Sequence, residues 1–201
     1  MILSNDQTDA LTEVVSIGVG RAAAVLNGMI DSHIKLQVPF VKIVSMKDLV
    51  SQTDGGQEQA LSAVRLAFMG PFAGTAALVF PPDSASKLVS VLIGEEPGSS
   101  ALDSEMVGTL TEVGNIVMNG VMGSIGNVLD KRIDYAVPSY MMDTIQNLVS
   151  NTQEPDPNAT ILMAQTRFTI EQLEIDGDVM LYFEVGSFDA LLAALDEAML
   201  K

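Results

Sequence analysis

An internal repeat constrains the fold of this 201-residue chain more than any other feature of its sequence. When the sequence is shifted by 99 residues, LTEV at 11–14 falls on LTEV at 110–113, and the same register continues to a shared proline. The aligned stretches are 11–39 with 110–138, 48–53 with 147–152 and, after a small change in length, 74–92 with 177–195. A unit of this length is too long for a solenoid repeat, so the pattern favours two similar halves around a pseudo-twofold axis.

Each half has the same expected order of elements, which is a long helix, several strands and a shorter closing helix. Asp83 is a candidate N-cap for the first closing helix, and Gly94 is expected to end it. The fold class that this predicts is α+β, with the strands of both halves in one continuous sheet covered by the helices. We expect a single domain over 1–201, with repeats 6–94 and 103–201 joined by a connector at 94–104. The expected helices are 6–31, 83–93, 103–130 and 187–199, and the expected strands are 34–46, 61–69, 73–81, 133–144, 159–169 and 178–185.

Composition excludes several classes of function. The formal net charge of -16 argues against binding to nucleic-acid phosphates, which requires clustered Lys and Arg. The absence of cysteine excludes disulfides and thiolate metal sites. The first ten residues lack the basic and apolar regions of a signal peptide. Residues 66–80 carry no charge, but they are short for a membrane span and Gly70-Pro71 interrupts them. We therefore expect a soluble cytoplasmic protein that does not insert into a membrane.

A carboxylate and an amide stand close together in the expected long helix of the second half. Glu112 and Asn115 are three residues apart, so their side chains leave the same face of the helix, and Asn119 is expected on that face one turn later. An isolated pair of this kind is an ordinary feature of the solvent-facing side of an amphipathic helix. The repeat gives it more weight, because Glu13 occupies the equivalent position in the first half.

The pattern E-x-x-N, followed by 22 residues and a proline, resembles the signature of the CheC/CheX/FliY chemotaxis phosphatases. Proteins of the CheC type carry it once in each half, with an Asp or Ser four residues before the Glu. The resemblance covers essentially the whole chain. In the second half Glu112, Asn115 and Pro138 match the pattern, but Gly108 replaces the Asp or Ser. In the first half Asp9, Glu13 and Pro39 match it, and Ser16 replaces the Asn.

The resemblance implies a phosphorylated receiver protein, CheY, as substrate. The receiver itself supplies the Mg²⁺ and a Lys that hold its aspartyl phosphate, so no cofactor is expected in this chain. Asn115 is the candidate for orienting the attacking water, because an amide offers a donor and an acceptor. Glu112 is the candidate for docking against the receiver's Lys. We expect the site of Asp9, Glu13 and Ser16 to be degenerate, since a hydroxyl is shorter than an amide. Pro39 and Pro138 are expected to set the geometry between helix and strand.

Two other functions remain open at the level of sequence. The first is a non-catalytic chemotaxis adaptor that binds CheY or the receptor deamidase CheD, which the degenerate motifs would suit. The second is a metal-dependent hydrolase, but no spaced set of carboxylates and histidines supports it. Gly18 and Gly20 are interpreted as close-packing positions, and Met118 and Met122 as core residues. Two fused halves already contain the pseudo-twofold axis, so we expect a monomer.

Overall fold

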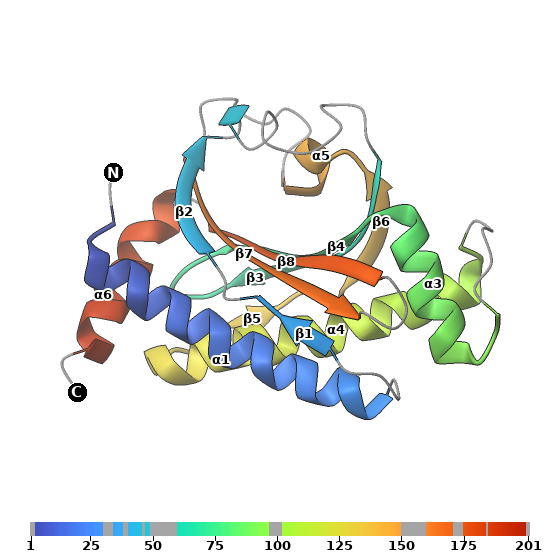
Figure 1. Cartoon of the computed structure of the whole chain (residues 1–201). Helices are drawn as coiled ribbons and strands as arrows, with labels where there is room; N and C mark the ends of the chain where they lie inside the picture. Colours follow the sequence, from blue (N-terminus) through green and yellow to red (C-terminus); the bar gives the residue numbers. More distant parts are fainter. Residues whose placement is uncertain are drawn as a thin grey trace.

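The computed structural model of the chain describes residues 3–29, 34–37, 40–45, 47–48, 60–96, 102–149, 160–170, 175–183 and 185–199. Figure 1 shows a curved sheet with the two long helices on one face. In chain order the elements are α1 (Asn5–Met29), β1 (Ile34–Leu36), β2 (Phe40–Ser45), β3 (Leu61–Met69), β4 (Gly74–Phe80), α3 (Pro82–Ile93), α4 (Ser104–Leu129), β5 (Asp134–Tyr135), β6 (Ser139–Asp143), α5 (Ile145–Val149), β7 (Thr160–Ile170), β8 (Ile175–Phe183) and α6 (Val185–Met199).

The strands that the structure describes form one eight-stranded sheet whose central order is β7-β8-β4-β3. The two halves exchange their first strands. β1 and β2 of the first half pair with β7 of the second, and β5 and β6 of the second half pair with β3 of the first. All of these pairings are antiparallel. The expected α+β fold, with one continuous sheet covered by helices, is therefore confirmed, and this exchange joins the halves along both sides of the sheet.

The pseudo-twofold axis passes through the middle of the sheet, where β4 pairs with β8. Ala77 lies opposite Met180 in this ladder, and the repeat matches the same two residues to each other, because they are 103 positions apart. The two halves therefore meet at equivalent residues. Rotation about this pair relates α1 to α4, β3 to β7, β4 to β8 and α3 to α6.

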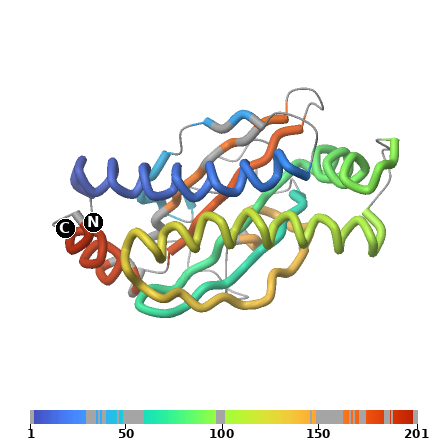
Figure 2. The backbone as a smooth tube through the Cα atoms, turned by 90° about the horizontal axis from the view of Figure 1, so that it is seen from below, coloured from blue at the N-terminus to red at the C-terminus, as the bar shows by residue number. Residues whose placement is uncertain are grey.

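The long helices α1 and α4 lie side by side on one face of the sheet (Figure 2). A Cβ added at Gly18 would stand 2.7 Å from the Val121 Cα, and one at Gly120 would stand 3.3 Å from the Ala22 Cβ. These contacts mark an antiparallel crossing at the middle of both helices. The interpretation of Gly18 as a close-packing residue is confirmed. For Gly20 it is wrong, because a Cβ there would meet none of the described atoms within 4 Å.

The sheet separates two apolar clusters. The larger one lies between the sheet and the helices and includes Met118 and Met122, both fully buried, so their assignment to the core is confirmed. The smaller one covers the opposite face, where Ile145 and Leu148 of the short helix α5 pack near Ala63 and Ala77. Among the described residues, no helix is both long and apolar enough to cross a membrane.

Three local expectations were wrong. The strand expected over 34–46 is divided into β1 and β2, and the one expected over 133–144 is divided into β5 and β6, which α5 then follows. Asp83 does not cap α3, because the helix begins at Pro82 and the N-cap position is Pro81, which has no side-chain hydrogen bond. Gly94 ends that helix in the left-handed conformation, as expected, with φ of 77°.

Candidate functional site

The helix α4 that carries Glu112 and Asn115 is held at both ends and pressed onto the sheet. Asp103 caps its start by accepting hydrogen bonds from the backbone N–H groups of Glu105 and Met106. Gly114 lies directly against Val64 of β3, so closely that a Cβ at residue 114 would overlap the Val64 side chain. The residue next to Asn115 is thus fixed against the sheet, which gives the site a rigid base.

The polar side chains of α4 lie on the face directed away from the sheet. Glu112 and Asn119 are exposed and Asn115 is half-buried, whereas Val113 and Gly114 between them are buried. Asn119 Nδ2 donates a hydrogen bond of 2.8 Å to Asn115 Oδ1. The expectation that these residues share one face is confirmed. The hydrogen bond between the two amides was not predicted from the sequence. Residues four apart on a helix are close enough to form one.

The equivalent positions on α1 carry different chemistry. Asp9 and Glu13 are exposed, like their counterparts on α4. The Ser16 hydroxyl donates to the backbone oxygen of Thr12 at 2.7 Å, so its single proton is used within the helix. The position equivalent to Asn119 is Gly20, which has no side chain. The first half therefore keeps the carboxylates and lacks both amides.

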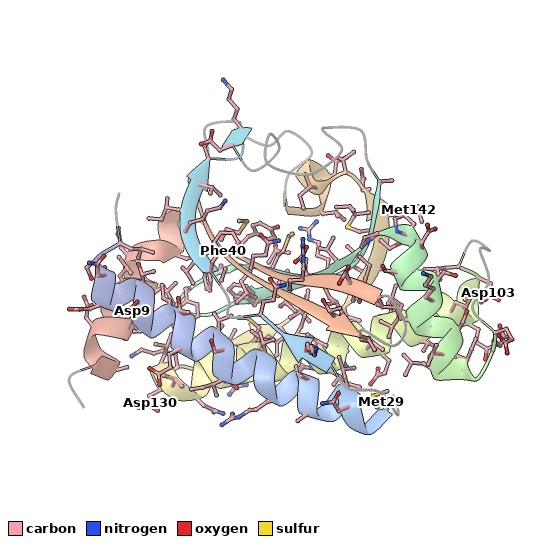
Figure 3. All side chains as sticks on the ribbon, viewed as in Figure 1. Asp9, Met29, Phe40, Asp103, Asp130 and Met142 are labelled. Carbon is pink, nitrogen blue, oxygen red and sulfur yellow. The ribbon has the colours of Figure 1, made fainter. Side chains whose placement is uncertain are left out.

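The two sets of candidate residues lie far apart. Figure 3 shows Asp9 at the same end of the helix pair as Asp130, and Met29 at the other end with Asp103. Glu13 and Glu112 stand on opposite sides of the crossing at Gly18 and Val121, which at 1.5 Å per residue separates them by about 20 Å along the helices. The structure does not bring the two sets together, so each would have to act by itself.

Pro138 lies in a β-bulge between β5 and β6. Tyr135 pairs with Phe68 and Ser139 pairs with Arg65, so three residues of one strand face two of the other. Proline has no N–H to donate, and Val137 before it is 88% exposed. The registers of β1 and β2 against β7 differ by the same single residue, although Pro39 itself lies outside the described residues. In the second half the motif proline thus stands where the strand after the long helix changes register.

The charged residues of α4 are both acidic, Glu105 and Glu112. Arg21 is the single basic residue of α1, and its Nη1 donates to Ser124 Oγ of α4 at 3.1 Å. In the part of the chain that the structure describes, no group of three His, Cys, Asp or Glu side chains is arranged to hold a metal ion. What the face of α4 offers is a carboxylate, an oriented amide and a rigid helix. That set can bind a cation and orient a water, but it cannot by itself activate one strongly.

Comparisons with known proteins find chemotaxis proteins among those similar to this chain. The family model described as chemotaxis phosphatase CheX matches residues 62–158, a range that contains Glu112, Asn115 and Pro138. The CheY-P phosphatase CheC of Bacillus subtilis is 23% identical over 98% of this chain and 97% of its own length. The crystal structure of Thermotoga maritima FliY superimposes with a TM-score of 0.77 and 19% identity, over 98% of this chain and 100% of that one. The FliM middle domain from H. pylori follows with a TM-score of 0.71 and 13% identity, over 96% and 99% of the two chains.

Proposed function

We propose that this chain, a chemotaxis protein of the CheC/CheX/FliY type, is a phosphatase that hydrolyses the aspartyl phosphate of a CheY-type receiver. The observation that carries the proposal is the amide of Asn115, which stands on a rigid helix with a carboxylate one turn before it. The similarity to the CheY-P phosphatase CheC of Bacillus subtilis supports the choice of substrate.

The proposed reaction is an in-line attack by water on phosphorus. A bond forms between the water oxygen and phosphorus, the bond from phosphorus to the aspartate oxygen breaks, and the products are the free carboxylate and inorganic phosphate. The receiver would supply a Mg²⁺, which would neutralise charge on the phosphoryl oxygens. Such a reaction needs positioning more than a strong base, because its transition state is loose. Asn115 would provide that positioning through its N–H and its carbonyl oxygen.

Docking is assigned to Glu112. Its carboxylate is exposed one helical turn before Asn115 and is free to approach a partner's ammonium group, since the structure gives it no described hydrogen bond. A charge-assisted bond to the receiver's active-site Lys would set the register of the two proteins. The same contact would bring the amide of Asn115 over the phosphoryl group, because both side chains leave one face of one helix.

The first half favours a binding role without catalysis. The proton of Ser16 is donated to Thr12, and there is no amide at residue 16 or 20. Asp9 and Glu13 remain exposed and could still contact a partner such as CheY or CheD. We therefore assign one working site, on α4, and propose that the protein acts as a monomer.

A turnover assay tests the proposal against a purely binding function. The phosphorylated receiver is supplied at a hundredfold excess over this protein, and inorganic phosphate is followed over time. A phosphatase releases many equivalents of phosphate for each protein molecule. An adaptor would protect the phosphate or leave its decay unchanged, and either of those results would overturn the proposal.

A further inference from the structure

The hydrogen bond between Asn119 and Asn115 couples the orientation of the proposed catalytic amide to that of Asn119. A side-chain amide can turn over about its last torsion, which exchanges the donor and the acceptor. Asn119 Nδ2 donates to Asn115 Oδ1 at 2.8 Å, so Asn115 cannot turn over by itself without losing this bond, and the reversed bond forms only if both amides turn over together. In this pairing the oxygen of Asn115 lies toward the C-terminal end of α4, and among the described residues both N–H donors of Asn115 and one lone pair of Oδ1 are left for a water.

We propose that Asn119 is a positioning residue of the phosphatase site, which acts on the reaction by holding the amide of Asn115. This inference rests on the proposed function. A water is oriented only if the donor and the acceptor that it meets have fixed places, and an unrestrained amide would present the reversed arrangement for part of the time. Donation to Oδ1 also polarises the amide and makes its N–H groups stronger donors.

A role limited to helix stability does not account for this contact. Asn119 is exposed, and amide pairs four residues apart on a helix surface contribute little to stability. Asparagine is also a weaker helix former than most residues that could occupy an exposed helical position. Asparagine at both 115 and 119 is therefore unfavourable for the helix itself. This favours a role for the pair in the chemistry of the site.

The first half provides an internal comparison. It lacks both members of the pair, since Ser16 is equivalent to Asn115 and Gly20 is equivalent to Asn119. A Cβ at Gly20 meets none of the described atoms within 4 Å, so the structure has room for a side chain there. An amide can therefore be added at residue 20 without repacking the core, and the half-buried Ser16 can be replaced separately.

The first test separates catalysis from docking in α4. Asn119→Asp keeps the size of the side chain but cannot donate, and its carboxylate would attract Asn115 Nδ2 and turn the amide over. We expect kcat for release of phosphate from the phosphorylated receiver to fall about three- to tenfold, the effect of one lost hydrogen bond, with KM unchanged. Asn119→Ala should lower kcat less than Asn119→Asp, and Asn119→Gln, which keeps a donor, should recover part of the loss. The urea midpoint should not fall in any of the three variants.

The outcomes distinguish this inference from the proposed function. If Asn115→Ala abolishes the accelerated decay and Asn119→Asp keeps the wild-type kcat, the role of Asn119 is wrong and the phosphatase assignment stands. If the receiver phosphate is lost as fast with Asn115→Ala as with wild type, the assignment of Asn115 to the site is wrong and the inference about Asn119 is wrong with it.

The second test rebuilds the pair in the first half. In an Asn115→Ala background, Ser16→Asn is compared with Ser16→Asn combined with Gly20→Asn. The matched control is Ser16→Asn with Gly20→Ala, which removes the same helix glycine without adding a donor. The inference predicts that the double-asparagine variant releases phosphate about three- to tenfold faster than either of the others. A double variant no faster than the alanine control would overturn it.

Discussion

Gly18 of α1 lies against the backbone of Val121 of α4, at a distance that leaves no room for a side chain. A Cβ at residue 18 would stand 2.7 Å from the Val121 Cα. Gly18→Ala should therefore force the helices apart, and we expect the free energy of unfolding to fall by about 1–3 kcal/mol, the usual range for overpacking. Urea denaturation measures this change.

Gly20 on the same helix is the matched control, because a Cβ there has open space among the described residues. Gly20→Ala should raise the free energy of unfolding by about 0.5–1 kcal/mol, since alanine favours a helix more than glycine does. Equal effects of the two substitutions would show that the helix crossing is not as close as the structure has it.

Asp103 determines how firmly the site helix begins. Its carboxylate accepts from the N–H groups of Glu105 and Met106, both at 2.9 Å. Asp103→Ala should lower the free energy of unfolding by about 1 kcal/mol, whereas Asp103→Asn should keep most of it, because asparagine is an equally good N-cap. Thermal unfolding of the two variants checks the difference, and an alanine variant as stable as wild type would contradict the capping role.

Tyr182 should make the protein sensitive to alkaline pH. Burial, and after it the charge of Asp178, raises the pKa of its phenol above the usual value of 10.0. The unfolded chain then releases this proton at a lower pH than the folded one. The contribution of the protonated Tyr182 to the free energy of unfolding is therefore fully present below pH 10 and is lost as the pH rises above it. The loss should reach about 1.4 kcal/mol per pH unit above pH 10.

The matched variant for this effect is Tyr182→Phe, which also removes the hydrogen bond of 2.6 Å to Met180 Sδ. It should be less stable than wild type at pH 8, and the difference should narrow or reverse between pH 10 and pH 11. Denaturant titrations at several pH values give both curves. If the free energies of unfolding of the two proteins fall in parallel between pH 10 and pH 11, the loss of stability at alkaline pH does not come from Tyr182.

Glu112 is predicted to act in docking. Glu112→Gln keeps the size of the side chain and removes its charge, so KM for the phosphorylated receiver should rise about tenfold while kcat changes little. The dependence of KM on salt should weaken as well, because a charged contact is lost. Glu13→Gln is the comparison from the degenerate half and should leave kcat unchanged. A fall in kcat without a change in KM would assign Glu112 to the chemical step instead.

Local sequence patterns were sufficient for the long helices and for most strand positions. The apolar periodicity of α1 and α4 and the repeated order of elements predicted their bounds to within two residues. The burial of Met118 and Met122 followed from their spacing. The face shared by Glu112, Asn115 and Asn119 followed from helical geometry alone.

The remaining features depend on contacts between residues far apart in the chain. That β5 and β6 pair with β3 of the other half is a property of the assembled sheet, which no local pattern encodes. The helix α5 is too short for periodicity, and it forms because Ile145 and Leu148 fill the smaller cluster. The different packing of Gly18 and Gly20 depends on which side of α1 faces α4.

The central claim is that the amide of Asn115 accelerates the loss of phosphate from the receiver. The most direct measurement is the decay of phosphorylated receiver with catalytic amounts of wild type, Asn115→Ala and Ser16→Ala, each first shown to be folded by its urea midpoint. The account predicts that with Asn115→Ala the receiver loses its phosphate only at its own unassisted rate. With Ser16→Ala the rate of phosphate loss should equal that with wild type. If Asn115→Ala keeps the wild-type rate, or if Ser16→Ala loses it, the assignment of a single working site on α4 is wrong.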